Sequence, residues 1–365
     1  MADRDSNSSA AGAVNNKSEE AGVGNLAATQ IESNGNYGSS KPTTFWGKFK
    51  VSLKRFWWAY LIFFLCSVVL AVMLLIFVGI KNIAQDKIDN ATLEVLGISC
   101  TDTLEDTFTL GINTTLKSGT TKATVSKFKG VMYLEDEPSH RPFVTIDFPS
   151  VKNKRFQTVN ISQNVQIVDK DALTTFNTWL LSNESLRVTV LGHPTVKVPG
   201  ISKKYGVTFK KTVTLTGLNG FAGINAYNGS ISLKNFTDGT NFHTTTEIPN
   251  ASVVTFEIGN ATFANFLNGS HVGTTYLDNV TLYPGKNVFS LRSSISQGPV
   301  LTAVQTQPYC GSGIVPFQLS GRGVDNNGQN LTYFGEALAA HNTTIDIDLD
   351  TPLKALGLNP KCPSS

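Results

Sequence analysis

The sequence predicts a mainly β protein, with tandem antiparallel, Ig-like β-sandwiches and one short helix, preceded by a single transmembrane helix. Three observations predict this. Residues 57–80 are 24 consecutive uncharged, largely apolar residues. After residue 90, short runs rich in Val, Ile, Thr and Phe recur at intervals near ten residues, separated by Gly, Pro or Asn. These runs also recur in a similar order in both halves of that region.

Composition narrows the range of functions. The 365 residues carry 30 basic and 27 acidic side chains, and only 16% of all residues are charged. A nucleic-acid binder would carry a basic excess, and an acidic tail protein the opposite. We therefore expect no nucleic-acid partner.

The first 56 residues divide into two segments. Residues 1–44 are mostly Ser, Asn, Ala and Gly, cannot bury a core, and are predicted to form a disordered cytosolic tail. Residues 45–56 are basic and aromatic, with Phe45 and Phe49 on one helical face and Trp46 nearby. Such a segment is typical of a membrane interface. A plain flank that only fixes the topology is the alternative.

The uncharged run predicts the transmembrane helix. A helix of 24 residues is about 36 Å long, enough to cross about 30 Å of hydrocarbon with some tilt. Trp57 and Trp58 lie at one predicted interface, as amphipathic rings should. A cleaved signal peptide is disfavoured, because the run is long and begins 56 residues into the chain. Cys66, inside the span, is either a buried thiol or an acylation site.

Flanking charge predicts the orientation. Five basic residues precede the span with no acid after Glu32, whereas Lys81 and Lys87 after it are offset by Asp86 and Asp89. The positive-inside rule places the N-terminus in the cytosol, giving a type II protein whose residues 81–365 face the lumen or the exterior. A vacuolar or other endomembrane location and the plasma membrane stay open.

Glycosylation sequons support this topology. Chance would give roughly five Asn-x-Ser/Thr sites after the span. Twelve are present, at Asn90, Asn113, Asn160, Asn183, Asn228, Asn235, Asn250, Asn260, Asn268, Asn279, Asn330 and Asn342. We predict glycans at these sites and none at Asn7 and Asn16, which precede the span.

The region after the span reads as β-structure interrupted by one helix. Six of its runs are typical strands: 108–116, 143–148, 186–191, 207–215, 253–258 and 343–349. Residues 169–181 predict the helix, with Asp169 or Asp171 as its cap and Leu173, Phe176 and Leu180 on one face. Similar elements recur at offsets of 119 to 134 residues. We therefore predict sandwiches over 81–215 and 216–350, and a C-terminal tail over 351–365.

The stretches 215–221 and 248–291 resemble a fungal domain of unknown function found, often in tandem, in single-pass membrane proteins. The matching features are LTGLNGF, the step Pro249-Asn250-Ala251-Ser252, a Gly-x-x-x-Phe strand, and the turn from Leu282 to Asn287. That family is similar to the group 2 late-embryogenesis-abundant (LEA-2) sandwiches. The resemblance implies a seven-stranded LEA-like sandwich with a helix at one end. It also implies a vacuolar or lysosomal membrane for some relatives, a lipid-binding groove, and no catalytic residues.

The sequence contains no recognisable catalytic motif. Neither a P-loop nor a Gly-x-Ser-x-Gly nucleophile elbow occurs, and the five histidines are scattered singly. We therefore expect a non-enzymatic protein without a cofactor. Asp346, Asp348 and Asp350 alternate with apolar residues. They would form either a Ca²⁺ site or the charged outer face of an edge strand, which is the commoner arrangement.

Three cysteines follow the span. Cys310 is predicted to pair with Cys362, which leaves Cys100 buried or available for an intermolecular bond. Sequence alone does not choose the connectivity.

Two functions fit these expectations. The first is a membrane-anchored binding or scaffold module that presents glycosylated sandwiches to a protein or a wall polymer. The alternative is a lipid-binding or lipid-transfer module, with a groove lined by Phe176, Trp179 and Leu180. The same three residues would otherwise be ordinary core. A glycosidase would need a paired-carboxylate cleft, and no pattern isolates one.

Overall fold

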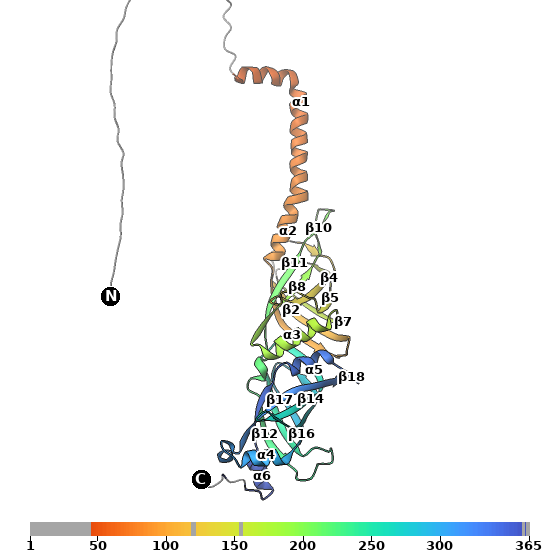
Figure 1. Cartoon of the computed structure of the whole chain (residues 1–365). Helices are drawn as coiled ribbons and strands as arrows, with labels where there is room; N and C mark the ends of the chain where they lie inside the picture. Colours follow the sequence, from red (N-terminus) through yellow and green to blue (C-terminus); the bar gives the residue numbers. More distant parts are fainter. Residues whose placement is uncertain (1–44, 118–121, 153–155, 360–361, 363–365) are drawn as a thin grey trace, which may run out of the picture. The chain divides into compact units, whose positions relative to one another are not determined.

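The computed structural model describes residues 45–117, 122–152, 156–359 and 362, of which 45–55 and 156 are described by their backbone alone. The predicted tail over 1–44 lies outside the described residues. The described residues fall into two units, divided between Ser67 and Val68, and each is described by itself. Figure 1 shows the elements of the second unit, with α2 and β10 at one end and α4 and α6 at the other.

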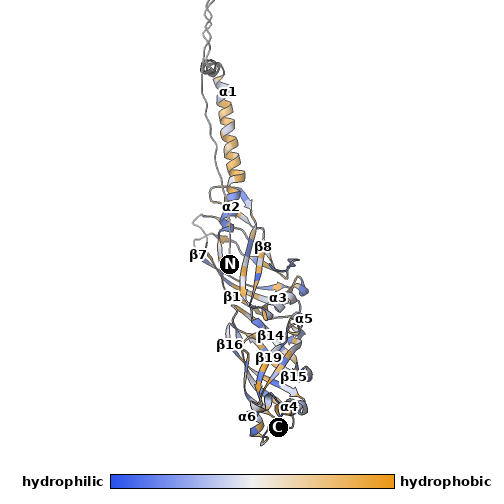
Figure 2. Ribbon diagram, turned by 60° about the vertical axis from the view of Figure 1, so that its left-hand side comes forward, coloured by the Kyte–Doolittle hydropathy of each residue, from blue (hydrophilic) through white to orange (hydrophobic). Residues whose placement is uncertain are grey.

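A long helical segment precedes the β region. It consists of α1 (Phe45–Leu74), the π-helical turn η1 (Leu75–Gly79) and α2 (Ile80–Asp89). Phe56 has non-helical dihedral angles, so the predicted juxtamembrane helix turns there before the span begins. Among the described residues, Phe56–Asp89 is the one helix long and apolar enough to cross a membrane, and none of its most apolar window is buried. Figure 2 shows α1 mainly in the hydrophobic colour, whereas hydrophilic residues appear at α2.

The first repeat, defined as residues 92–216, holds two facing sheets. One contains, in order, β1 (Thr92–Thr101), β2 (Thr107–Lys117) and β7 (Phe156–Gln166). The other contains β11 (Phe209–Thr216), β8 (Ser185–Gly192), β4 (Phe128–Leu134) and β5 (Val144–Phe148). A small third sheet joins β10 (Lys204–Gly206), β9 (Thr195–Lys197), β3 (Thr124–Val125) and β6 (Val151–Lys152). The predicted helix is α3 (Lys170–Ser182), and Asp169 caps it by accepting a hydrogen bond from the Ala172 N–H.

The second repeat, residues 225–348, is built in the same order. Its strands are β12 (Asn225–Ile231), β13 (Phe242–Asn250), β14 (Val254–Leu267), β15 (Ser270–Leu282), β16 (Gly285–Ile295), β17 (Ile314–Asn326), β18 (Gln329–Asn330) and β19 (Thr343–Asp348). Its helices are α4 (Gln297–Val304) and α5 (Thr332–Ala339), with short 3₁₀ turns η2 (Asn219–Phe221) and η3 (Tyr309–Gly311) nearby. The final helix, α6 (Asp350–Ala355), falls inside the segment assigned to the tail and buries Leu353.

Strand pairing repeats between the two halves. In the first, β1 pairs with β2 and β2 with β7, while β8 pairs with both β4 and β11 and β4 with β5. In the second, β12 pairs with β13 and β13 with β16, while β17 pairs with both β14 and β19 and β14 with β15. The mainly β fold is therefore confirmed, and its topology is duplicated along the chain.

One pairing distinguishes the repeats. In the second, β15 and β16 pair over five residue pairs and close the two sheets along one side. In the first, the corresponding strands β5 and β7 form no ladder between described residues. That side is joined instead by the bridge between Val144 and Ile167, by a bond from the Val168 N–H to the Phe143 carbonyl, and by bonds between the Gln163 amide and the Asp147 backbone. The sheets of the first repeat are therefore less tightly tied together.

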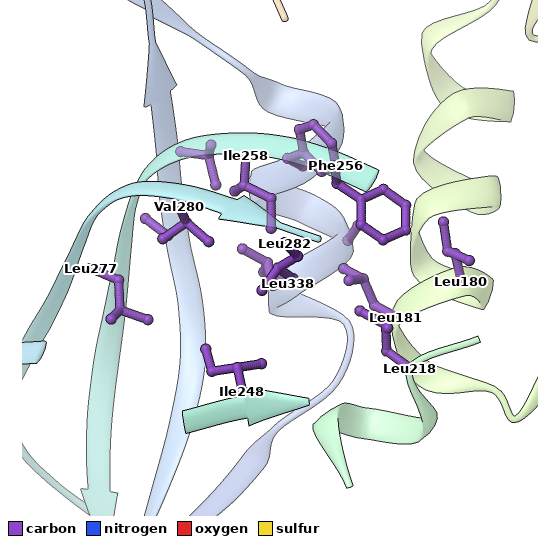
Figure 3. Packing of buried hydrophobic residues seen from close by; sticks show 14 of the residues in the cluster. Leu180, Leu181, Leu218, Ile248, Phe256, Ile258, Leu277, Val280, Leu282 and Leu338 are labelled. Carbon is purple, nitrogen blue, oxygen red and sulfur yellow. The ribbon is translucent and has the colours of Figure 1, made fainter. Parts of the chain in front are cut away.

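The two repeats share one framework, because β1 pairs in parallel with β14 and joins sheets of both repeats into eleven strands. The junction also has a continuous apolar core. Figure 3 shows Leu180 and Leu181 of α3 beside Phe256, Leu282 and Leu338 of the second repeat. This packing explains why residues 68–365 form one compact unit.

Candidate functional site

A cavity of about 330 Å³ lies inside the first repeat, between its two large sheets. Its walls come from alternate residues of these strands, because successive side chains of a strand point to opposite faces. On the β1–β2–β7 sheet the walls include Val95, Ile112 and Val159. On the facing sheet they include Val190 and Val213. Nearly all of the lining is therefore hydrocarbon.

The exposure of these inward side chains changes along the cavity. Leu93, Leu116 and Val159 lie toward α2 and are partly exposed. Farther from α2, Val188 is 3% exposed and Leu215 is 3% exposed. Since inward-facing apolar residues become accessible only where the interior is open, the cavity opens at the end where α2 enters.

Helix α2 and the small sheet form the rim of this opening. Ile80, Ile83 and Ala84 of α2 line the cavity, as do Val125 and Val196 of the small sheet. Ala84 and Val196 also belong to a separate small apolar cluster. The rim is thus apolar, and it begins at the last residue of the uncharged run.

Polar contacts fix α2 against the first repeat. The Gln85 side chain donates a hydrogen bond to the Thr208 carbonyl at 2.8 Å and accepts one from the Thr208 N–H at 2.8 Å. Lys211 donates to the backbone carbonyls of Asp89 and Ala91, and its partial burial lowers its pKa. About two turns before Gln85, the ring of Phe77 in η1 has its centroid 3.3 Å from the Lys203 ammonium. The rim is therefore held in place at several points.

Aromatic rings line the same end. Phe128 and Phe148 stack with ring centroids 4.8 Å apart, and Phe209 packs beside Phe128 at 5.5 Å. Their placement depends on glycine, since a Cβ at Gly192 would meet the Phe128 ring at 2.5 Å and one at Gly130 would meet Phe148 at 2.8 Å. The sheet surface is hollowed to admit flat rings.

Three described lining residues carry polar or charged groups: Lys87, Thr114 and Gln157. Thr114 is satisfied, because its hydroxyl donates to the Val159 carbonyl at 3.0 Å. The Gln157 Nε2 atom is buried without a hydrogen-bond partner. Lys87 is exposed on α2 and lies 4.0 Å from Asp86.

A smaller void of about 40 Å³ adjoins the large cavity and shares Ile98, Met132 and Leu215 with it. Cys100 lines this void, and burial raises the pKa of its thiol to about 12. The thiol therefore stays protonated at neutral pH, and no partner cysteine is bonded to it.

The groove predicted from Phe176, Trp179 and Leu180 is not where the open cavity lies. Phe176 stacks on Phe143 at 4.8 Å and borders only the small void, while Leu180 is 1% exposed. Trp179 is partly buried against the same core. All three belong to or pack against the apolar core to which α3 and α5 contribute, and Figure 3 shows Leu180 beside the second repeat. The cavity residues that could not be recognised from the sequence lie in β1, β2, β7, β8 and β11. In these strands apolar and polar residues alternate as they do in any strand of a sandwich.

Eleven of the twelve sequon asparagines are exposed. The exception is Asn250, which is 3% exposed and donates through its amide to the carbonyls of Val254 and Leu282. A glycan on that nitrogen would break both bonds and need space the core lacks, so the structure conflicts with glycosylation at Asn250. Asn7 and Asn16 lie outside the described residues.

The remaining predicted residues are placed as follows. Cys310 and Cys362 form a disulfide, and Cys66 is exposed on the span. Asp346 is in β19, Asp348 accepts hydrogen bonds from the N–H groups of Asp350 and Thr351, and Asp350 pairs with Lys354 at 2.5 Å. These three carboxylates therefore do not share one strand face. No group of three His, Cys, Asp or Glu in the described part of the chain could hold a metal ion.

Trp57 and Trp58 are 55% and 67% exposed and pack edge to face with centroids 5.7 Å apart. Phe45, Trp46 and Phe49 lie in the helical backbone of α1, and their side chains lie outside the described residues.

A family described as a protein of unknown function, DUF3712, matches residues 141–265. The match runs from just before β5 into β14, so it spans the junction of the two repeats and about a third of the chain. The chain therefore contains this domain of unknown function. No curated protein matches the sequence.

Three solved structures are similar to parts of the chain. A protein from Archaeoglobus fulgidus is 9% identical, covers 34% of this chain and 94% of its own, and has a TM-score of 0.22. A solution structure from Arabidopsis thaliana is 12% identical over 34% and 80%, with a TM-score of 0.23. The CupB6 tip adhesin of Pseudomonas aeruginosa is 9% identical over 71% and 98%, with a TM-score of 0.19. With TM-scores this low, the similarities assign neither a fold nor a function to this chain.

Proposed function

We propose that this chain is a single-pass membrane protein whose first repeat binds lipid in the cavity beside the membrane anchor. The observation that carries the proposal is the apolar cavity that opens onto α2. Its volume of about 330 Å³ lies at the lower end of the range for ligand pockets, about 300 to 1,000 Å³. The apolar lining favours a hydrocarbon ligand, because only a few of the lining residues offer polar groups.

The size of the cavity supports a resident ligand. Voids left in protein cores cost about 24 cal/mol per Å³, so 330 Å³ left empty would cost on the order of 8 kcal/mol. Whole domains are stable by only about 5–15 kcal/mol. Water is a poor occupant, since a buried water needs two to four polar partners. An acyl chain would restore the missing contacts.

The position of the opening supports lipid as that ligand. Ile80 is both the last residue of the uncharged run and a lining residue of the cavity. With the span in a bilayer, the apolar rim lies at the membrane surface, and a lipid would pass from bilayer to cavity without crossing water. In this proposal the N-terminus is cytosolic, and the β region is lumenal or exterior, on a vacuolar, endomembrane or plasma membrane. A fungal origin and LEA-like ancestry belong to the same proposal.

Photo-crosslinking tests the proposal directly. The full chain is placed in nanodiscs containing phosphatidylcholine with a photoactivatable acyl chain, and crosslinked peptides are identified by mass spectrometry. We expect crosslinks to the inward residues of β7, β8 and β11. Crosslinks confined to the span would overturn the proposal.

Paired variants sharpen this experiment. Val159→Trp places a large ring in the cavity, whereas Val288→Trp makes the same change at a strand residue of the second repeat that is 56% exposed. We expect Val159→Trp to lose the cavity crosslinks and Val288→Trp to keep them. Equal crosslinking of both variants would contradict lipid binding in the cavity.

A second candidate is a non-enzymatic binding or scaffold module for a protein or a wall polymer. The observation that favours it is the eleven exposed sequon asparagines, together with a second repeat whose interior is filled. The two roles are compatible, because the first uses the interior of one repeat and the second uses outer surfaces. Loss of partner binding in a variant lacking the sequons of the second repeat, with cavity crosslinks intact, would support this candidate.

A further inference from the structure

One residue that lines the cavity has a buried side-chain nitrogen without a hydrogen-bond partner. Four buried side-chain nitrogen or oxygen atoms of the described residues have no hydrogen-bond partner, and Gln157 Nε2 is the one whose residue lines the large cavity. An N–H group taken from water without an acceptor is destabilising, so such groups are rare in native proteins. Its position in a ligand-sized cavity therefore points to an acceptor that a ligand would supply.

Strand register places Gln157 near the opening of the cavity at α2. Gln157 in β7 pairs with Leu116 in β2, and Leu116 pairs with Leu93, which follows α2 closely in the chain. The next inward residues of β7, Val159 and Ile161, line the cavity progressively farther from α2. The Gln157 amide thus lies toward the end of the cavity at α2, and apolar walls extend away from it.

This arrangement matches the chemistry of an acyl lipid. Such a lipid carries a carbonyl oxygen where its polar part meets the hydrocarbon chain. A neutral amide N–H suits a neutral carbonyl acceptor, and it would satisfy the donor that the fold leaves open. The chain would then extend from Gln157 past Val159 and Ile161.

We propose that Gln157 is the specificity-determining residue of the lipid site, and that it donates a hydrogen bond to the ester or amide carbonyl of an acyl lipid whose chain fills the cavity. This inference rests on the proposed function. It adds the class of ligand and its direction in the cavity.

The test compares two chain-matched ligands, methyl palmitate, which carries an ester carbonyl, and n-octadecane, which carries no acceptor. Full-length protein is stripped of lipid, held in amphipol, and titrated with each ligand delivered from cyclodextrin. Gln157→Met keeps the side-chain length and removes the donor. Gln166→Met, at an exposed position of the same strand, is the matched control.

We expect the wild type and Gln166→Met to prefer the ester by about fivefold, the value of one net hydrogen bond. Gln157→Met should bind both ligands equally while keeping its affinity for n-octadecane. An ester preference that survives in Gln157→Met would overturn the role of Gln157. A preference for a sterol over both ligands would overturn the acyl assignment. If the wild type binds none of these ligands, the proposed function itself fails.

Discussion

Replacing Ile112 with alanine should cost much less stability than replacing Ile248 with alanine. The two isoleucines lie on corresponding strands, β2 and β13, of repeats with the same pairing order. Ile248 is 4% exposed and points into packed core (Figure 3). Ile112 lines the cavity and is partly exposed. The pair therefore compares one substitution in a filled interior and in a hollow one.

The expected magnitudes follow from what each side chain touches. Truncating a buried isoleucine to alanine costs about 2–5 kcal/mol, part of it from the new void. We expect about 3 kcal/mol for Ile248, whose surroundings are packed on all sides. For Ile112 the void already exists and the side chain loses few contacts, so we expect about 1 kcal/mol.

Thermal unfolding of full-length protein in amphipol, stripped of lipid, measures the difference. At about 2 °C per kcal/mol, Tm should fall by about 6 °C for Ile248→Ala and about 2 °C for Ile112→Ala. Reloading with acyl lipid should widen the loss for Ile112→Ala, because the wild-type side chain then contacts the ligand. Equal losses without lipid would refute the reasoning, since they would mean that the first repeat is as densely packed as the second.

Three further predictions test other parts of the structure. Leu180→Ala should lower the free energy of unfolding by about 3 kcal/mol, measured by thermal unfolding, because Leu180 is 1% exposed in the junction core. The same variant should leave lipid crosslinking in the cavity unchanged. Lost crosslinking would instead support a lipid groove on α3. Glycopeptide mass spectrometry of protein from a eukaryotic host should find glycans among the eleven exposed sequons and none at Asn250, and a folded chain glycosylated at Asn250 would contradict the packing around it. Hydrogen bonds from the Thr240 hydroxyl and N–H, and from His243, lower the pKa of Asp238 to about 2, so the stabilising effect of its carboxylate is present above pH 3.8 and is lost as the pH falls toward 2. Asp238→Asn should therefore lower Tm at pH 6. A Tm difference between variant and wild type that is as large at pH 2 as at pH 6 would count against this role.

Several features could be predicted from local sequence because their causes are local. The apolar run over 57–80 needs no tertiary partner to be recognised as a candidate span. Asp169 caps α3, and Leu173, Phe176 and Leu180 fall on its buried face, as the helical period requires. The strand runs were recognisable for the same reason, since alternation and turn residues act within a few positions.

The interior of the first repeat could not be predicted in this way. Val95 and Ile112 alternate with outward residues in the same manner as Val254 and Phe256, yet the first pair lines a cavity and the second pair is buried core. Alternation states which face of a strand points inward, and it does not state how far away the opposite sheet lies. The sequence could not separate a groove from a core at Phe176, Trp179 and Leu180, because an apolar helix face is the same signal for both.

By itself, the sequence determined the mainly β character, one candidate membrane span and the capped helix, because each depends on neighbours within one element. Only the tertiary structure decided that one repeat is hollow and the other filled. The ladder between β15 and β16 closes the second repeat, whereas the described residues of β5 and β7 in the first repeat are joined by a single bridge and a few hydrogen bonds in place of a ladder. Sheet separation is set by such long-range hydrogen bonds between strands, and the space left between the sheets is the reason that Gln157 lines a cavity.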